Sequence, residues 1–296
     1  MLNFEIAGGS ISGRHHIGTH QILKAANNQD AYLFYQDDDI IIGCVSDGCG
    51  SAPFSEVGSL LITRMVISSI VNRYKDNNLS DNIETQLYLL DDNISKTIMN
   101  YTSNLQLCYN DDDIYKILND YFLCTIMGFI ITKEITHIFY CGDGIYCING
   151  EYNKLGPWPE NAPPYLSYGF FPQRLLTREY EEEDLGFKYI SKPTAEINSL
   201  LIGTDGVDDL YLAADKDMPG LQQKVGNLEQ FWTQDAYFSN PDLIRRKLSV
   251  INKEYIKYDN EQGKIITYPG LLPDDSTLIV VRREPQEVSD ENICEQ

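Results

Sequence analysis

The sequence predicts an α+β protein in which antiparallel sheets are covered by helices. Short runs rich in β-branched and aromatic residues gather near the N-terminus, in the middle of the chain and at its C-terminal end. Two long stretches with helical apolar periodicity lie between the first two groups, and Asp-Gly and Asn-Gly pairs place tight turns between the middle strands. Groups of strands that alternate with groups of helices are typical of this class.

The first strands are expected at residues 3–7, 32–35 and 40–45. The first two segments have the alternating pattern of half-buried strands, whereas residues 40–45 form a short apolar run that favours a buried, central strand. The acidic tripeptide at 37–39 separates the second strand from the third and predicts the tip of a hairpin.

Helices and a strand meander follow. Apolar positions recur at helical spacing over residues 55–74 and 81–105, and a short third helix is expected at 112–121. Further strands are expected at 123–132, 136–141 and 145–148. Residues 156–172 hold five prolines and two glycines, which fits either a flap near a functional site or an ordinary connector.

The last third of the chain predicts strands at 187–190, 200–203 and 277–282 and a short helix from Val207. A second helix is expected from Pro241 to Tyr255, and residues 220–238 show no clear pattern. Without a repeat or a linker, the sequence favours one domain over residues 1–284 and an acidic tail at 285–296.

Composition excludes some classes of partner. The chain carries 44 acidic against 23 basic side chains, a formal net charge of −21, which argues against nucleic acid or an anionic membrane as the main partner and is compatible with divalent cations. The seven cysteines form no Cys-x-x-Cys pair and are expected to be reduced thiols. Because the N-terminus lacks a signal-peptide pattern and the longest apolar stretch, residues 122–131, is too short for a membrane span, we expect a cytoplasmic protein.

Four aspartates stand at the ends of expected strands. Asp47, Asp143 and Asp205 each lie beside a glycine after an apolar run, and Asp274 precedes such a run. An ordinary turn explains any one of them alone. If their strands share sheets, however, the carboxylates converge, and they repel one another unless a cation lies between them. Mg²⁺ and Mn²⁺ prefer such oxygen ligands, and a pair of these ions can activate a water beside a phosphoryl group. The spacing therefore favours metal-assisted hydrolysis of a phosphate ester.

Five short motifs occur along the chain: Asn28-Gln29-Asp30-Ala31, Ser46-Asp47-Gly48-Cys49-Gly50, Cys141-Gly142-Asp143, Gly203-Thr204-Asp205-Gly206-Val207 and Asp274-Asp275-Ser276-Thr277-Leu278-Ile279-Val280. In this order they resemble the PPM family, the metal-dependent serine/threonine phosphatases of protein phosphatase 2C type. The resemblance covers about residues 13–282, and Gly18-Thr19-His20 is similar to the stand-alone bacterial branch. It implies an antiparallel β-sandwich flanked by helices on both sides, in αββα layers.

The resemblance also implies a metal site for Mn²⁺ or Mg²⁺, with two ions and a labile third. Its positions fall on Asp30, Asp47, Gly48, Asp143, Asp205 and Asp274. Asp47 would bridge both ions and the Gly48 carbonyl would bind one of them, while Asp205 and Asp274 would hold the other. Asp30 would hold waters of the ions, and Asp143 would join Asp205 at the labile ion. The family pattern favours Asp274 over Asp275, which takes the place of a residue that is often Asn.

Two positions depart from the family pattern. Ala25 stands where many members have an arginine that grips the substrate phosphate, and Lys24, Arg14 or His20 could take over that contact. Cys49 stands where some members have a histidine proposed to protonate the leaving group. The catalytic candidates are therefore Asp47, His20 and Lys24. The cluster His15, His16 and His20 matches no standard zinc spacing, and a polar loop with exposed imidazoles is favoured.

Two hypotheses follow. The first is a metal-dependent protein phosphatase that hydrolyses phosphoserine and phosphothreonine by a metal-activated water and opposes a Ser/Thr kinase. The second is a catalytically weak or inactive phosphatase-like binding or regulatory module, which Ala25 and Cys49 motivate. The complete acidic set favours the enzyme.

Overall fold

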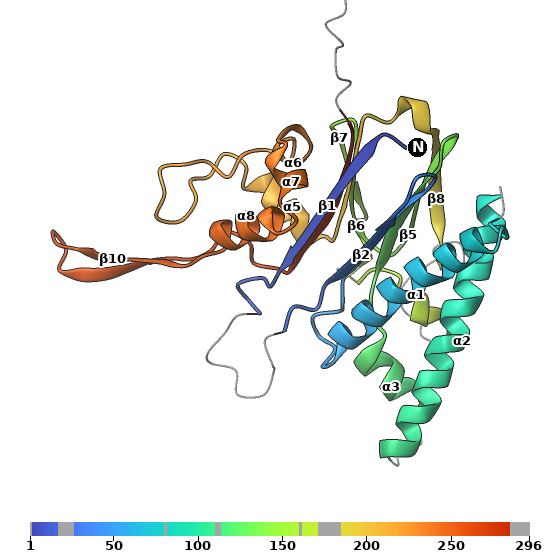
Figure 1. The fold of residues 1–296 in the computed structure, drawn as a ribbon. Helices are drawn as coiled ribbons and strands as arrows, with labels where there is room; N and C mark the ends of the chain where they lie inside the picture. Colours follow the sequence, from blue (N-terminus) through green and yellow to red (C-terminus); the bar gives the residue numbers. More distant parts are fainter. Residues whose placement is uncertain are drawn as a thin grey trace, which may run out of the picture.

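The computed structural model describes residues 2–16, 27–79, 82–109, 114–159, 162–170 and 185–284. Two five-stranded sheets stack face to face, and helices lie against the outer face of each (Figure 1). Neighbouring strands in both sheets are antiparallel. The α+β sandwich with αββα layers is therefore confirmed. The expected acidic tail at 285–296 lies outside the described residues.

The first sheet brings the two ends of the described chain together. Its strand order is β1 (Phe4–Ile11), β12 (Ser276–Arg283), β9 (Ser199–Gly203), β6 (Gly144–Ile148) and β7 (Glu151–Leu155). Strands β1 and β12 pair over their full length, from Phe4 opposite Arg283 to Ile11 opposite Ser276. The segment after β1 therefore meets the segment before β12 at one end of the sheet.

The second sheet has the order β2 (Ala31–Gln36), β3 (Ile41–Ser46), β4 (Ile126–Ile131), β5 (Ile135–Cys141) and β8 (Lys188–Pro193). Every residue of β3 and β4 is buried, because helices cover one face of this sheet and the first sheet covers the other. Strands buried on both faces are apolar without alternation, as observed here. The expected hairpin tip at 37–39 is confirmed by the pairing of Gln36 with Ile41.

Three apolar clusters hold the layers together. Helices α1 (Ser55–Lys75), α2 (Ile83–Tyr109) and α3 (Ile114–Tyr121) pack on the second sheet. The first sheet is covered by α5 (Gly206–Leu212), α6 (Gln230–Thr233), α7 (Ala236–Ser239) and α8 (Leu243–Ile251). Between the sheets lies a third cluster with fully buried side chains such as Phe129 and Ile279.

The C-terminal part corrects two expectations. Helix α8 ends at Ile251 rather than at Tyr255, because the side chain of Asn252 bonds the Ser12 carbonyl (2.9 Å) and the Leu272 amide (3.1 Å). Tyr255 instead opens β10 (Tyr255–Asp259), which pairs with β11 (Lys264–Tyr268) in a hairpin that extends away from the sandwich (Figure 1). Residues 220–238 contain α6 and most of α7, and each helix is too short to produce a periodic pattern.

Among the described residues, no helix combines the length and the apolar character needed to cross a membrane.

The packing of α1 on α3 gives a stability prediction. Alanine normally stabilises a helix interior relative to glycine by about 1 kcal/mol. At Gly58, however, a Cβ would lie 2.0 Å from the Tyr121 carbonyl oxygen. We therefore expect Gly58→Ala to lower the free energy of unfolding by about 2 kcal/mol, measured by urea denaturation. The control is Gly169→Ala, because a Cβ there meets nothing within 4 Å. Equal stability of the two variants would contradict the close helix contact.

Candidate functional site

The second sheet places two aspartates next to each other at one end of the sandwich. Asp30 immediately precedes β2, Asp47 immediately follows β3, and the adjoining ends of these strands are paired. Gly48 allows the chain to turn back beside the segment before β2. Its amide donates to the Gln29 carbonyl (3.1 Å), and a Cβ on Gly48 would lie only 2.7 Å from that oxygen. A side chain at position 48 would therefore separate the two strands' aspartates.

The first sheet adds three aspartates. Asp143 lies in the turn that leads from β5 of the second sheet into β6 of the first. Asp205 follows β9 and Asp274 shortly precedes β12, and the two strands are paired near these ends, with Gly203 opposite Leu278. Strand pairing therefore brings chain segments more than 60 residues apart to one end of the sandwich.

The five carboxylates influence one another electrostatically. The pKa of Asp47 is raised well above its ordinary value, first by burial and then by the charges of Asp205, Asp30, Asp143 and Asp274. A carboxylate exerts such an effect only at short range in a poorly solvated space. Asp205, Asp30, Asp143 and Asp274 therefore all lie within electrostatic range of Asp47.

Burial is the main cause of the other shifts. It raises the pKa of Asp205 to about 8, with the charges of Asp143 and Asp274 adding to the effect. It raises the pKa of Asp30 to about 7 and that of Asp143 to about 6. The Thr204 hydroxyl donates to Asp30 Oδ2 (2.7 Å) and opposes the shift of Asp30.

Two buried oxygens of the cluster lack a hydrogen bond. Neither Asp30 Oδ1 nor Asp143 Oδ1 has a donor among the described residues. Buried polar atoms are normally paired, so such oxygens indicate a ligand site. Crowded carboxylate oxygens with raised pKa values and free lone pairs are the donors that hard divalent cations prefer. The residues therefore fit Mg²⁺ or Mn²⁺.

Asp274 and its neighbour Asp275 occupy different environments. Asp275 is almost fully buried, and its carboxylate accepts hydrogen bonds from the backbone amides of Gly13 (2.7 Å) and Gln29 (2.6 Å). Asp274 is exposed and accepts a hydrogen bond from the Asp275 amide (2.8 Å). Asp275 therefore connects the segment after β1 with the segment before β2, while the charge of Asp274 acts on Asp47 and Asp205.

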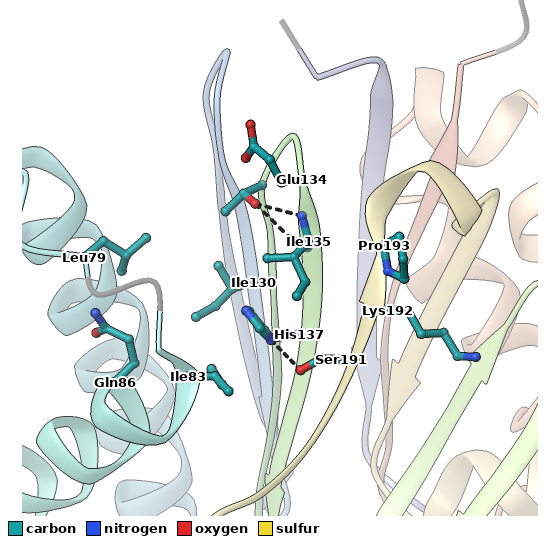
Figure 2. Close-up of a pocket in the computed structure, with 11 residues that line it drawn as sticks. Leu79, Ile83, Gln86, Ile130, Glu134, Ile135, His137, Ser191, Lys192 and Pro193 are labelled. Atoms are coloured by element: carbon teal, nitrogen blue, oxygen red, sulfur yellow. Dashed lines mark hydrogen bonds between the residues drawn. The ribbon is translucent and has the colours of Figure 1, made fainter.

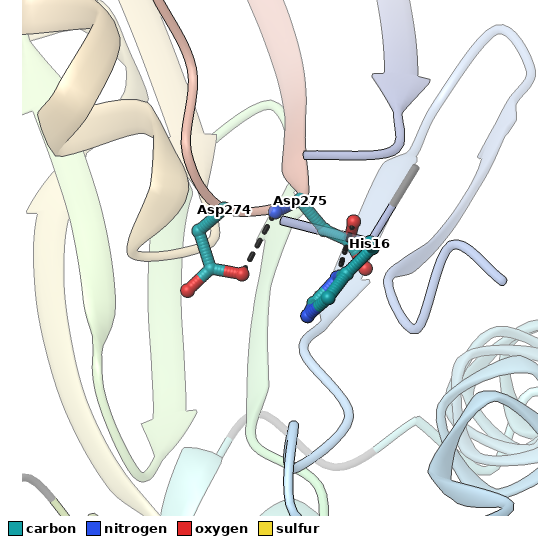
Figure 3. A group of neighbouring side chains, drawn as sticks. All are labelled: His16, Asp274 and Asp275. Atoms are coloured by element: carbon teal, nitrogen blue, oxygen red, sulfur yellow. Dashed lines mark hydrogen bonds and ion pairs between the residues drawn. The ribbon is translucent and has the colours of Figure 1, made fainter. Parts of the chain in front are cut away.

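His16 is a residue that the sequence analysis did not select. Its Nδ1 lies 2.8 Å from Asp275 Oδ1, and Figure 3 shows its imidazole in front of Asp275 and beside Asp274. One ligand atom from each of these three side chains lies within 4.8 Å of the others. The expectation of exposed imidazoles holds for His15 and is wrong for His16, which is half-buried. A histidine in a polar loop gave no signal of this carboxylate contact.

Two of the three proposed catalytic residues cannot be placed. His20 and Lys24 lie in 17–26, outside the described residues, as does Ala25. Of the other candidates for a phosphate contact, Arg14 donates from Nη1 to the Gly270 carbonyl (2.6 Å). That bond ties Arg14 to the loop before β12.

The proline-rich segment reaches the aspartate cluster. Tyr165 is buried and belongs to the same apolar cluster as Cys49. The pKa of Tyr165 is raised by burial first and then by the nearby Cys49, Asp47 and Asp143. The Pro164 carbonyl accepts a hydrogen bond from the Cys141 thiol (3.5 Å). Of the two expectations for this segment, a flap beside the site fits the described part, 162–170, better than a simple connector does.

A separate cavity of about 610 Å³ lies between α2 and strands β5 and β8 (Figure 2). Its walls are mostly apolar, and none of the five aspartates lines it. His137 points into this region, and its Nδ1 bonds the Ser191 hydroxyl (2.7 Å). Burial lowers the pKa of His137.

Comparisons with known proteins agree with this architecture. The family model for Protein phosphatase 2C matches residues 17–240. No curated protein sequence matches the chain.

Solved structures show the same fold. A bacterial serine phosphatase is 12% identical, with a TM-score of 0.50 over 96% of this chain and 100% of its own. A variant of a bacterial serine phosphatase is 14% identical, with a TM-score of 0.50 over 94% of this chain and 98% of its own. At such low identity the similarity establishes the fold alone.

The contrast between the paired aspartates gives a second prediction. Asp275→Ala would leave two buried backbone amides without an acceptor, so we expect it to lower the free energy of unfolding of the metal-free protein by about 3 kcal/mol. Asp274→Ala is the matched control, since it removes one local bond and also relieves repulsion in the cluster. Urea denaturation with EDTA measures both. A smaller loss for Asp275→Ala than for Asp274→Ala would contradict the role of Asp275.

The raised pKa values predict how stability depends on pH. A carboxyl group whose pKa is higher in the folded protein binds more protons there than in the unfolded chain. Its stabilisation is complete below the unfolded pKa of about 4 and is lost as the pH rises through the folded value. Because Asp143, Asp30 and Asp205 titrate at about 6, 7 and 8, the metal-free protein should lose stability between about pH 5 and pH 8.5.

Urea denaturation in EDTA across this pH range tests the expectation, with Asp205→Asn as the comparison. The variant should show a flatter pH dependence because it removes the group with the highest pKa of the three. A stability that rises steadily over this range in the unmodified protein would contradict the crowding of these carboxylates.

Proposed function

Because the chain belongs to the protein phosphatase 2C family, we propose that it is a metal-dependent protein phosphatase that hydrolyses phosphoserine and phosphothreonine. The observation that carries the proposal is the cluster of Asp30, Asp47, Asp143, Asp205 and Asp274, which contains buried oxygens without a hydrogen-bond donor among the described residues. A protein that only presented this fold to a partner would have no use for five crowded carboxylates, because they destabilise it.

The proposed ligands of Mn²⁺ or Mg²⁺ are Asp47, the Gly48 carbonyl, Asp205 and Asp274. Asp30 would hold waters of the ions, and Asp143 would join Asp205 in holding a labile third ion. Two such cations, when bound, lower the pKa of a water and stabilise the charge of a phosphoryl group. These assignments rest on the family positions and on the electrostatic effects of these aspartates on one another.

The chain's own residues would orient the site and limit water. The Thr204 hydroxyl fixes Asp30 by donating to its Oδ2 (2.7 Å). Tyr165 packs beside Cys49, so that residues 162–170 cover one side of the cluster. A partly closed site raises the effect of each charge on the reacting group.

The substrate would be a phosphorylated protein, and the enzyme would oppose a Ser/Thr kinase in the cytoplasm. The reduced state of the cysteines supports that compartment: Cys44, Cys49, Cys124, Cys141 and Cys147 are all free thiols in the described part of the chain. The strongly acidic composition supports a protein substrate over nucleic acid.

A regulatory module is the second candidate. It is favoured by Cys49 and Ala25, which replace the histidine and the arginine of many relatives. Such a module would keep the fold while showing negligible turnover. Calorimetry with Mn²⁺ and a turnover assay on the same sample separate the two candidates, since two-ion binding with turnover eliminates the module.

Hydrolysis of p-nitrophenyl phosphate tests the enzyme. We expect activity with Mn²⁺, none with EDTA, and a loss of about 100-fold or more in Asp47→Asn, because that variant removes a carboxylate shared by the metal site. Asp217→Asn is the control, since Asp217 forms an exposed ion pair with Lys224. Activity that persists both in EDTA and in Asp47→Asn would refute the proposal.

A further inference from the structure

We propose that the imidazole of His16, anchored on Asp275, donates a hydrogen bond from Nε2 to the phosphoryl group of the substrate. The inference rests on the proposed function. Ala25 stands where many relatives have an arginine that binds the substrate phosphate, and His16 would make this contact instead. The contact would position the phosphoryl group beside Asp47 and Asp274.

The first step is the anchor. Asp275 Oδ1 lies 2.8 Å from His16 Nδ1, and the Asp275 carboxylate is itself fixed by the backbone amides of Gly13 and Gln29. The backbone of His16 is fixed as well, because its amide donates to the Gly13 carbonyl (3.0 Å). The ring therefore cannot turn away without breaking the contact with a buried carboxylate.

The second step is the direction of the free end of the ring. A Cβ placed on Gly50 would lie 3.9 Å from His16 Nε2, so this nitrogen lies beside the loop that follows Asp47. On its other side the ring lies near Asp274, as Figure 3 shows. The side chain keeps 24% of its surface exposed, which leaves it accessible to a ligand. His16 is therefore at the edge of the carboxylate cluster and open to solvent.

The third step is charge. A phosphate ester is an anion and needs hydrogen-bond donors within a strongly acidic site. Among the described residues, Lys154 acts on Asp143 of the cluster, but it is paired with Asp208 (2.5 Å). Arg14 acts on Asp209 rather than on the cluster, and it donates to the Gly270 carbonyl (2.6 Å). His16 pairs with Asp275 through Nδ1, and its Nε2 is left to contact the substrate. When both nitrogens carry protons, both donate, and the Asp275 carboxylate favours this form. The contact with Asp275 raises the pKa of His16, and burial opposes this shift.

The experiment compares His16→Ala with His15→Ala, its neighbour in sequence, which is exposed. Calorimetry measures the binding of inorganic phosphate to the Mg²⁺-loaded proteins, and a separate titration measures Mn²⁺ binding to the metal-free proteins. Turnover of p-nitrophenyl phosphate gives KM and kcat. We expect His16→Ala to weaken phosphate binding and raise KM by about 10-fold or more, since it removes a charge-assisted hydrogen bond. His15→Ala should leave both unchanged, and Mn²⁺ affinity should stay the same in both variants.

Three outcomes would overturn the inference. Equal phosphate affinity in the two variants would show that His16 does not contact the anion, as would a lack of phosphate binding by the unmodified protein. A loss of Mn²⁺ affinity in His16→Ala would assign the imidazole to support of the metal site. If phosphate binding depends on His16 and yet no variant shows turnover, the inference holds and the proposed enzymatic function fails, so the two failures are distinguishable.

Discussion

Carboxylates that lie close together repel one another, and the fold has to hold five of them at one end of its two sheets, from the buried Asp30 to the exposed Asp274. Burial and mutual repulsion act in the same direction on Asp47 and Asp205, since both raise the pKa. The opposing free energy comes from the apolar clusters between and outside the sheets. The layered core is thus the support that allows a repulsive cluster to exist, and a bound cation would relieve the repulsion.

Asp275 shows how the same structure stabilises a buried carboxylate without a cation. Two backbone amides donate hydrogen bonds to it, and His16 Nδ1 lies 2.8 Å from its Oδ1, so protein groups surround its charge. Asp30 and Asp143 each have an oxygen with no donor among the described residues. Asp275 therefore organises the backbone, whereas Asp30 and Asp143 have an oxygen left to bind a ligand.

The sequence predicted what depends on local pattern. Apolar runs followed by Asp-Gly placed Asp47, Asp143 and Asp205 at strand ends, and antiparallel pairing then brought them together. It could not distinguish the environments of Asp274 and Asp275, because their difference arises from Gly13 and Gln29, more than 240 residues away.

The contact of His16 was also out of reach of sequence patterns, because it depends on the pairing of β1 with β12 across the whole chain. The extension of α8 to Tyr255 failed for a similar reason. Tyr255 continues the helical spacing of Leu248 and Ile251, but Asn252 ends the helix through contacts with residues near Ser12 and Leu272. Local periodicity thus predicts an element, while distant contacts determine where it ends.

The formal charge of −21 raises the question of how an anionic substrate approaches such a protein. At physiological ionic strength the Debye length is about 8 Å, so acids spread over the surface are largely screened from a phosphate at the site. Only charged groups within about one Debye length of the site act strongly on the substrate phosphate. At that range, bound divalent cations would reverse the sign of the local field. Binding of substrate would then depend on prior occupation of the carboxylate cluster by metal. The imidazole at its edge would select the orientation of the anion, because a single fixed donor adds direction to an attraction that is otherwise uniform.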